Sequence, residues 1–230
     1  MAEIIPAILS KNYEDLKNKI SLVRGIVPIV QIDICDGIFV KATTWPFETK
    51  SLDEHFTRIQ NEQEGLPFWE DIDFELDLMV HDAVSNFDVY TKLGPRRIIF
   101  HIEAVGNLEE FKHFLEGIET YTRDIIEIGV AINPSTDIAQ IFPLVNCIDF
   151  VQCMGIEHIG LQGEGFSEQC LEQIKKLKEK SSDLVVSVDG GVNSASAPKI
   201  IDAGADRLVI GSAIFNTDDI LETVEQFKNL

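Results

Sequence analysis

Two glycine-containing turns, one of them beside a carboxylate, are the residues of this chain best suited to chemistry. The run 187–192 reads Ser-Val-Asp-Gly-Gly-Val, and the run 209–215 reads Val-Ile-Gly-Ser-Ala-Ile-Phe. Glycine lets the backbone approach a phosphate closely, and N–H groups at a helix start supply partial positive charge without a Lys or Arg side chain. The turns therefore predict a phosphate site beside Asp189, contacted by Gly190, Gly191, Gly211 and Ser212.

Acidic side chains stand near the ends of several apolar, strand-like runs. Side chains two residues apart point to the same face of a strand, so four of these runs each carry a polar pair on one face: Gln31 with Asp33, Glu75 with Asp77, His101 with Glu103, and Ser187 with Asp189. Carboxylates that converge in one cavity cannot all remain ionised unless a cation or a shared proton relieves their repulsion. One such carboxylate alone is more often a strand-end cap or an ion-pair partner, but the set together predicts a metal site, proton chemistry or both.

These residues must be positioned by a regular alternation of strands and helices. Eight runs have the apolar character of strands: 4–9, 27–35, 74–80, 97–102, 126–132, 150–154, 184–189 and 207–210. Amphipathic runs with helical spacing lie between them, at 12–24, 84–93, 108–118, 167–180 and 218–228, with a further helix expected at Pro198. This order requires parallel strands with right-handed crossovers. We therefore predict an α/β fold, a single (β/α)8 TIM barrel that spans residues 1–230.

A doubly wound open sheet is the alternative fold. Such a sheet usually carries its glycine-rich phosphate loop after the first strand, where this chain has Ile8-Leu9-Ser10 instead. In a barrel the functional residues lie at the carboxyl ends of the strands, which matches the positions of the acidic pairs. The segment 41–73 is the one stretch without clear periodicity, and its charged run 61–65 predicts a solvated insertion.

Composition excludes several classes of function. A net charge of −20 argues against nucleic acid and anionic membrane surfaces as partners, because both need a basic face. The same field repels a phosphate ester, so a phosphate site would have to act through local backbone dipoles. No apolar run reaches transmembrane length and the amino-terminal residues lack the features of a signal peptide, so we expect a cytoplasmic protein. The four cysteines, Cys35, Cys147, Cys153 and Cys170, form no CxxC pair and are expected to be reduced core thiols.

Seven segments together resemble the ribulose-phosphate 3-epimerases in their order and spacing. They are 6–10 (Pro-Ala-Ile-Leu-Ser), 32–37 (Ile-Asp-Ile-Cys-Asp-Gly), 76–79, 100–104, 131–136, 188–192 and 204–215. The resemblance implies metal-assisted epimerisation at C3 of a ketopentose 5-phosphate, which interconverts D-ribulose 5-phosphate and D-xylulose 5-phosphate. It also implies that Asp33 removes the C3 proton, that Asp189 returns a proton from the opposite face, and that the protein is a homo-oligomer.

The metal ligands depart from the pattern of that family. The family has His-x-Asp on the second strand and a His on the third, and the matching residues here are Gln31 and Asp77. We expect one divalent metal held by Gln31, Asp33, Asp77 and Asp189. An all-oxygen set of this kind prefers Mg²⁺, Mn²⁺ or Ca²⁺ over zinc or iron. The alternative is that the site has degenerated and binds no metal.

The substrate pocket also departs from the family pattern. Ala7 stands where the family usually has a Ser, and the loop 159–164 keeps Gly160 and Gly163 but ends in Glu164. By the same resemblance, Gly163 joins the phosphate site. The residues expected to line the substrate pocket are Met79, Met154 and His101.

Other functions of the same fold define the alternatives. The hexulose-phosphate synthases and keto-gulonate-phosphate decarboxylases are similar barrels, but they carry Asp-x-Lys-x-x-Asp on the second strand, where this chain has Asp33-Ile34-Cys35-Asp36 and no Lys. Two alternatives stay open: an epimerase acting on a different ketose phosphate, and a catalytically altered or inactive phosphosugar-binding protein. In each case the expected partner is a small-molecule sugar phosphate.

Overall fold

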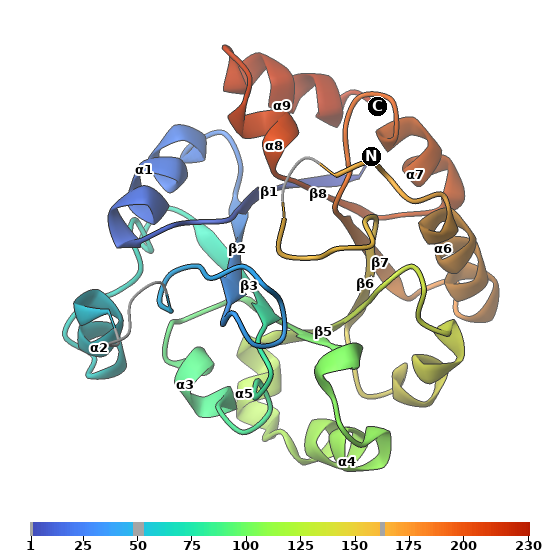
Figure 1. Cartoon of the computed structure of the whole chain (residues 1–230), viewed down its shortest axis with the longest axis horizontal. Helices are drawn as coiled ribbons and strands as arrows, with labels where there is room; N and C mark the ends of the chain where they lie inside the picture. The colour runs from blue at the N-terminus through green and yellow to red at the C-terminus, as the bar shows by residue number, and fades with distance from the viewer. Residues whose placement is uncertain (1, 48–52, 162–163) are drawn as a thin grey trace.

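Eight parallel strands close into a barrel in the computed structural model, which describes residues 2–47, 53–161 and 164–230 (Figure 1). In chain order the strands are β1 (Glu3–Ile8), β2 (Ile29–Cys35), β3 (Asp73–Met79), β4 (Arg97–His101), β5 (Glu127–Ile132), β6 (Phe150–Met154), β7 (Val185–Asp189) and β8 (Arg207–Ile210). Each strand pairs with its sequence neighbours, and β1 pairs with β8 to close the ring. The (β/α)8 prediction is confirmed and the open sheet is excluded. Each predicted strand matches the observed one to within two residues at both ends.

Helices cover the outside of the barrel: α1 (Tyr13–Val23), α2 (Glu54–Gln60), α3 (Phe87–Thr91), α4 (Leu108–Gly117), α5 (Thr120–Ile125), α6 (Gln169–Lys180), α7 (Ala197–Ala203), α8 (Ser212–Phe215) and α9 (Ile220–Lys228). Asn12 and Asn107 begin α1 and α4, because their side-chain oxygens accept backbone N–H groups of the first turn. The connection from β5 to β6 contains two 3-10 turns, Ile138–Gln140 and Phe142–Leu144. Helix α3 is shorter than the predicted run 84–93, because Ala83 and Val84 pack against the core from a turn.

The two faces of the barrel wall are both apolar but pack against different partners. Outward side chains such as Ile32, Leu76 and Val130 form the main core with the helices. Inward side chains form smaller clusters inside the barrel, among them Ile5, Ala7, Ile29 and Val209, and Ile99, Ala131, Phe150 and Met154. Gly129 on β5 leaves room for Phe150, because a Cβ at position 129 would clash with its ring. The barrel is therefore a filled core with polar groups towards its two ends.

An ion-pair network closes the amino end of the barrel. Arg97 pairs with Glu3, Glu75 and Glu127 at 3.1, 3.2 and 3.1 Å, and Arg207 pairs with Glu3 and Glu127 at 3.1 and 3.0 Å. The expectation that Glu75 joins Asp77 at the carboxyl end is wrong. Both side chains face the interior, but residues two apart lie about 6.6 Å apart along a strand, and Arg97 binds Glu75 at the lower level.

The segment between β2 and β3 is only partly a solvated insertion. Residues 61–63 are exposed, as predicted for the charged run. Trp45, Phe56 and Leu66 are instead buried in the main core, so apolar side chains anchor the segment on both sides of residues 48–52, which lie outside the described part of the chain. The segments that follow β2 and β6 lie over the barrel in the view of Figure 1.

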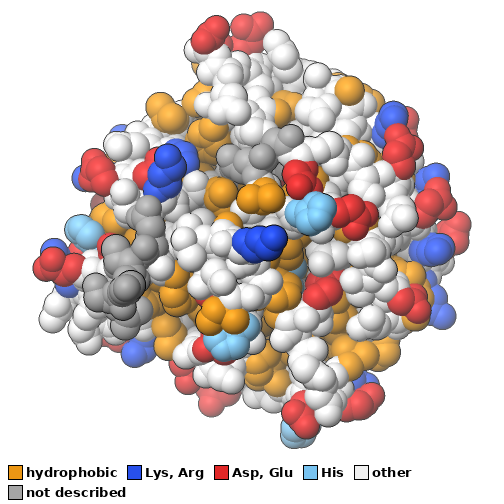
Figure 2. All heavy atoms as spheres, in the orientation of Figure 1, with side chains coloured by type: hydrophobic (Ala, Val, Ile, Leu, Met, Phe, Trp, Pro, Cys, Tyr) orange, Lys and Arg blue, Asp and Glu red, His pale blue; other side chains and the backbone are white. Residues whose placement is uncertain are grey.

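The outer surface carries charges of both signs. On the face shown in Figure 2, acidic side chains are spread around the rim and basic ones lie among them, so the negative charge does not gather in one patch. Surface ion pairs such as Lys178–Asp206 and Lys199–Glu168, both at 2.6 Å, are part of this pattern. Among residues 2–47, 53–161 and 164–230, no helix has the length and apolar character needed to cross a membrane.

Candidate active site

Three carboxylates meet at the carboxyl end of the barrel. Asp33 lies on β2, Asp77 on β3 and Asp189 at the end of β7, and one oxygen of each lies within 4.8 Å of the others. Their exposed fractions are only 6%, 0% and 8%. Asp33 and Asp77 are partners in the parallel register of β2 and β3, whereas Asp189 comes from the other side of the β1–β8 junction. The structure thus brings together three residues that the sequence predicted for one site.

Gln31 connects the two carboxylates predicted for proton transfer. Its Nε2 donates to Oδ1 of Asp33 and to Oδ2 of Asp189, both at 2.8 Å. Its carbonyl oxygen is buried and has no hydrogen-bond partner among the described residues. In this arrangement Gln31 is a hydrogen-bond donor. It becomes the predicted metal ligand only if its amide turns over, so that Oε1 faces the carboxylates.

Asp77 is held by two residues from other strands. Nε2 of His101 lies 2.9 Å from Oδ1 of Asp77, and Nε2 of Gln152 on β6 donates to Oδ2 at 3.3 Å. All three side chains are buried. Sequence reasoning missed Gln152, although one signal was present: it is the only polar residue in the apolar run of β6 and lies two positions before Met154.

Burial and mutual repulsion raise the pKa values of two of the carboxyl groups. Burial, followed by the charge of Asp77, raises the pKa of Asp33 to about 7. Burial, followed by the charge of Asp33, raises the pKa of Asp189 well above its usual range. The N–H groups of Gln31 oppose both shifts, because they stabilise the ionised forms. Near neutral pH the pair can therefore share one proton, which suits one group to accept a proton and the other to donate one.

The imidazole of His101 does not join the carboxylate cluster as a free ligand. Burial disfavours its charged form, but the adjacent Asp77 carboxylate outweighs burial and raises the pKa of His101. Its Nε2 is already engaged with Asp77, and its Nδ1 has no hydrogen-bond partner among the described residues. The atoms that remain for a cation are oxygens. Such a set fits Mg²⁺, Mn²⁺ or Ca²⁺, and a cation placed there would relieve the repulsion that raises the carboxyl pKa values.

A narrow cavity of about 50 Å³ lies at the carboxyl end of the barrel and reaches Asp33 and Asp189. Strand ends and the segments that follow them supply the rest of its lining: Ala7, Leu9, Met79, Met154, Ile156, Gly160, Leu161, Gly190, Gly191, Val192, Val209, Gly211 and Ser212. The lining includes the two methionines and the four phosphate residues predicted from the first two turns. His101 instead lines a neighbouring cavity of about 280 Å³. The predicted phosphate residue Gly163 lies outside the described residues.

The turn after β7 can be built only with glycine. Gly190 and Gly191 have φ values of +97° and +67°, which side chains rarely adopt. A Cβ on Gly191 would lie 2.8 Å from the backbone Cα of Phe166, in the segment after β6. The carbonyl of Gly191 accepts hydrogen bonds from Asn193 and Ser196, both at 2.9 Å, which fixes the turn. Because glycine has no side chain, the backbone of this turn is exposed at the cavity wall, as contact with a phosphate requires.

Besides Glu75, two further residues of the predicted polar pairs stay outside the cluster. Strand β4 ends at His101, and Glu103 belongs to the 3-10 turn Ile102–Ala104, so strand alternation no longer places it on the same face as His101. Its carboxylate accepts the backbone N–H of Asn133 at 2.7 Å. Ser187 is fully buried below Asp189, and its hydroxyl has no hydrogen-bond partner in the described part of the chain.

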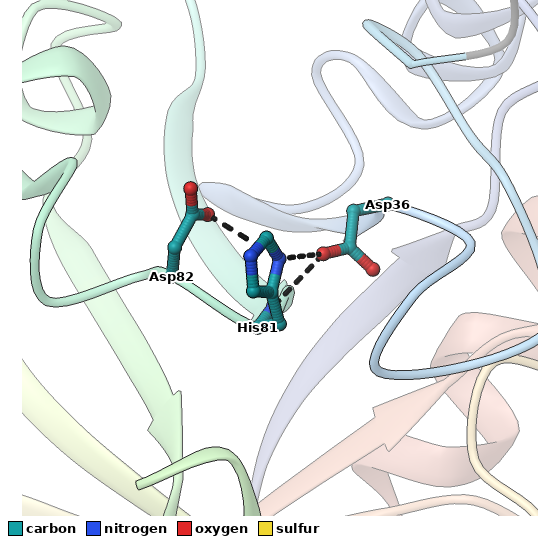
Figure 3. Close-up of side chains that lie close together, drawn as sticks. All are labelled: Asp36, His81 and Asp82. Atoms are coloured by element: carbon teal, nitrogen blue, oxygen red, sulfur yellow. Dashed lines mark hydrogen bonds and ion pairs between the residues drawn. The ribbon is translucent and has the colours of Figure 1, made fainter. Parts of the chain in front are cut away.

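A second polar group, Asp36, His81 and Asp82, lies beside the barrel mouth (Figure 3). Oδ2 of Asp36 accepts the backbone N–H of His81 at 2.8 Å and contacts its ring Nδ1 at 2.9 Å. Oδ1 accepts the N–H groups of Ile38 and Phe39, at 2.8 and 2.9 Å. Each oxygen of Asp36 thus already has two partners. This group ties the segment after β2 to the segment after β3, and it is a structural link rather than a cation site.

Comparison with known proteins gives a consistent answer. A sequence model described as the Ribulose-phosphate 3 epimerase family matches residues 3–215. The ribulose-phosphate 3-epimerases of Schizosaccharomyces pombe and Bacillus subtilis are 27% and 28% identical to this chain, over 99% of it and 93% and 99% of their own lengths. Among solved structures, the KGPDC of Streptococcus mutans shares the fold, with a TM-score of 0.69 and 15% identity over 100% of this chain and 96% of that one. The chain belongs to the ribulose-phosphate 3-epimerase family.

Proposed function

We propose that this protein is a sugar-phosphate 3-epimerase that interconverts D-ribulose 5-phosphate and D-xylulose 5-phosphate. The observation that carries the proposal is the pair Asp33 and Asp189, which line one cavity and share the amide of Gln31. Strands β2 and β7 are separated in the ring by β1 and β8. Two carboxylates placed in this way can flank a planar intermediate from opposite sides. Membership in the family and similarity to named epimerases along the whole chain support the proposal.

In the proposed reaction, the two carboxyl groups exchange protons with one carbon. The C3–H bond breaks, Asp33 takes the proton, and the electron pair moves into a planar enediolate. Protonated Asp189 then gives its proton to the opposite face of C3, which inverts the configuration. In the protein without a cation, the raised pKa values of the two groups allow one to be ionised and the other protonated near neutral pH. The reverse reaction exchanges their roles.

The remaining site residues would hold the charged parts of the substrate. A divalent cation held by Asp33, Asp77, Asp189 and the turned-over amide of Gln31 would supply positive charge where negative charge develops on the substrate oxygens. Backbone N–H groups of the two turns would hold the phosphate: Gly190, Gly191, Gly211 and Ser212, together with Gly163. The described residues of the cavity lining include no Lys or Arg, so these dipoles would be its local source of positive potential.

Exchange of the C3 proton tests this proposal directly. Purified protein, supplied in turn with Mg²⁺, Mn²⁺, Ca²⁺, zinc or iron, is incubated with ribulose 5-phosphate in deuterated water, and deuterium at C3 is followed by NMR. We expect exchange in the natural protein and its loss in Asp33→Asn and Asp189→Asn. Glu75→Gln is the matched control, because it neutralises an equally buried carboxylate at the other end of the barrel. Absence of exchange with every metal would rule out this substrate.

A phosphosugar-binding protein without epimerase activity is the second candidate. Its supporting observation is that Gln31 already presents N–H groups to Asp33 and Asp189, an arrangement that needs no cation. Such a protein would bind ribulose 5-phosphate in a calorimetric titration but catalyse no exchange. An epimerase for another ketose phosphate would instead exchange the C3 proton of that sugar. Cytoplasmic location and homo-oligomeric assembly stay predictions from the sequence.

A further inference from the structure

Asp77 differs from the other two carboxylates of the cluster in what it can reach. Asp33 and Asp189 line the cavity, and each accepts a hydrogen bond from Gln31 on one oxygen only. Asp77 is fully buried and is absent from the described cavity lining. It is therefore placed beneath the substrate space, where it can hold a cation but cannot exchange a proton with the substrate.

We propose that His101 and Gln152 are positioning residues that fix the Asp77 carboxylate so that it serves as the inner ligand of a divalent cation. The proposal rests on the cation part of the proposed function. It concerns two residues that do not touch the substrate cavity, one on β4 and one on β6.

The hydrogen bonds of Asp77 carry this inference. His101 holds Oδ1 at 2.9 Å and Gln152 holds Oδ2 at 3.3 Å, so each carboxylate oxygen has its own donor. Two donors on different oxygens fix both the position and the plane of a carboxylate, and each oxygen keeps a further lone pair for a cation. Asp33 and Asp189 each keep one oxygen that accepts no hydrogen bond from the described residues, as an acid or base needs.

His101 is the better anchored of the two donors. Its ring packs against Phe39, with ring centroids 5.4 Å apart, and its Nδ1 lies 3.9 Å from Oε2 of Glu103. The amide of Gln152 makes the longer bond to Asp77, at 3.3 Å against 2.9 Å for His101. We therefore expect the loss of His101 to weaken cation binding more than the loss of Gln152.

Direct measurement of Mn²⁺ binding, by electron paramagnetic resonance of the free ion, tests this inference without relying on activity. We expect His101→Leu to raise the Kd for Mn²⁺ about 10–100-fold, the usual cost of losing a partner that orients a metal ligand. Gln152→Leu should raise it by a smaller factor. His101→Gln should bind nearly as well as the natural protein, because its Nε2 can reach the same oxygen. Gln173→Leu is the matched control: it removes a buried amide that serves backbone carbonyls on the outside of the barrel.

The outcomes separate this inference from the proposed function. Weak binding in His101→Leu with rescue in His101→Gln supports it, provided circular dichroism shows both variants folded. Unchanged Mn²⁺ affinity in folded His101→Leu and Gln152→Leu overturns it, while C3 exchange by the natural protein leaves the epimerase proposal standing. If the natural protein binds no Mn²⁺ but still exchanges the C3 proton, this inference fails and the epimerase proposal loses only its cation.

Discussion

The two ends of the barrel each hold three carboxylates, but their surroundings differ in charge. At the amino end, Glu3, Glu75 and Glu127 surround the guanidinium groups of Arg97 and Arg207. At the carboxyl end, the hydrogen-bonding side chains on Asp33, Asp77 and Asp189 are two neutral amides and one imidazole. The amino end has two permanently charged guanidinium groups, whereas the cationic partner of the carboxyl-end cluster is the titratable imidazole of His101.

This difference indicates which end is built for stability and which for a ligand. Even with both guanidinium groups nearby, burial raises the pKa of Glu75 to about 7, so a buried carboxylate is costly at either end. The amino end offsets that cost with permanent ion pairs. The carboxyl end leaves the cost to be offset by protons, a cation or a substrate, and it is also the end with the cavity and the glycine turns.

Removal of a countercharge from the amino end should have the largest effect on stability. Arg97→Met leaves Glu75 buried beside one fewer cation, and we expect the free energy of unfolding to fall by about 3–5 kcal/mol. Arg96→Met is the matched control, because Arg96 is 56% exposed in its ion pair with Asp73 and should cost less than about 1 kcal/mol. Urea titration of both variants measures the difference. Equal losses in the two variants would contradict the role assigned to the amino end.

Removal of a carboxylate from the carboxyl end of the barrel should raise the free energy of unfolding above neutral pH. Because burial and Asp77 raise the pKa of Asp33 to about 7, the folded state keeps a proton that the unfolded state has released. The contribution of the Asp33 carboxyl group to stability is thus present below about pH 4 and is lost as the pH rises through 7. At pH 8, in metal-free buffer, we expect Asp33→Asn to be more stable than the natural protein by on the order of 3 kcal/mol.

The control for that prediction lies three residues away. Burial raises the pKa of Asp36, but hydrogen bonds from His81, Ile38 and Phe39 outweigh it and hold the pKa below the usual range. Asp36→Asn should therefore lower the stability at pH 8, where Asp33→Asn raises it. Urea titrations between pH 5 and 8 measure how the free energy of unfolding of each variant depends on pH. If Asp33→Asn does not change the stability in that pH range, the raised pKa of Asp33 is contradicted.

Addition of a cation should stabilise the protein by binding at the carboxyl end of the barrel. The expected gain is smaller than the effects of the substitutions above. At a concentration of 100 times its Kd, a ligand that binds only the folded state adds about 2.7 kcal/mol. We expect Mg²⁺ or Mn²⁺ to raise the melting temperature of the natural protein and of Glu75→Gln, but not of Asp77→Asn. Differential scanning calorimetry with and without the metal measures this. A shift that survives in Asp77→Asn but is lost in Glu75→Gln would place the cation at the wrong end.

Local sequence patterns determined most of the fold. The order of the eight strands follows from apolar runs separated by amphipathic ones, and period-two alternation places Asp33, Asp77 and Asp189 on inward faces. The glycine turn after β7 could also be predicted, because the positive φ of Gly190 and Gly191 and their close backbone approach require glycine. Segment 84–93 was harder to place, since apolar residues at a turn and in a helix look alike in the sequence.

Depth along the barrel and contacts between strands that are not sequence neighbours were decided only by the tertiary structure. Alternation predicts which face of a strand a residue is on, but not how far along the barrel axis it lies. Glu75 and Asp77 are therefore equivalent in the sequence, and only the structure shows that Glu75 binds Arg97. The contact of Gln152 with Asp77 joins β6 to β3, and the bridge of Gln31 joins β2 to β7. Such pairs depend on the tilt and closure of the whole ring. The sequence by itself therefore determined the barrel and its three carboxylates, and the closed ring decided which groups hold each of them.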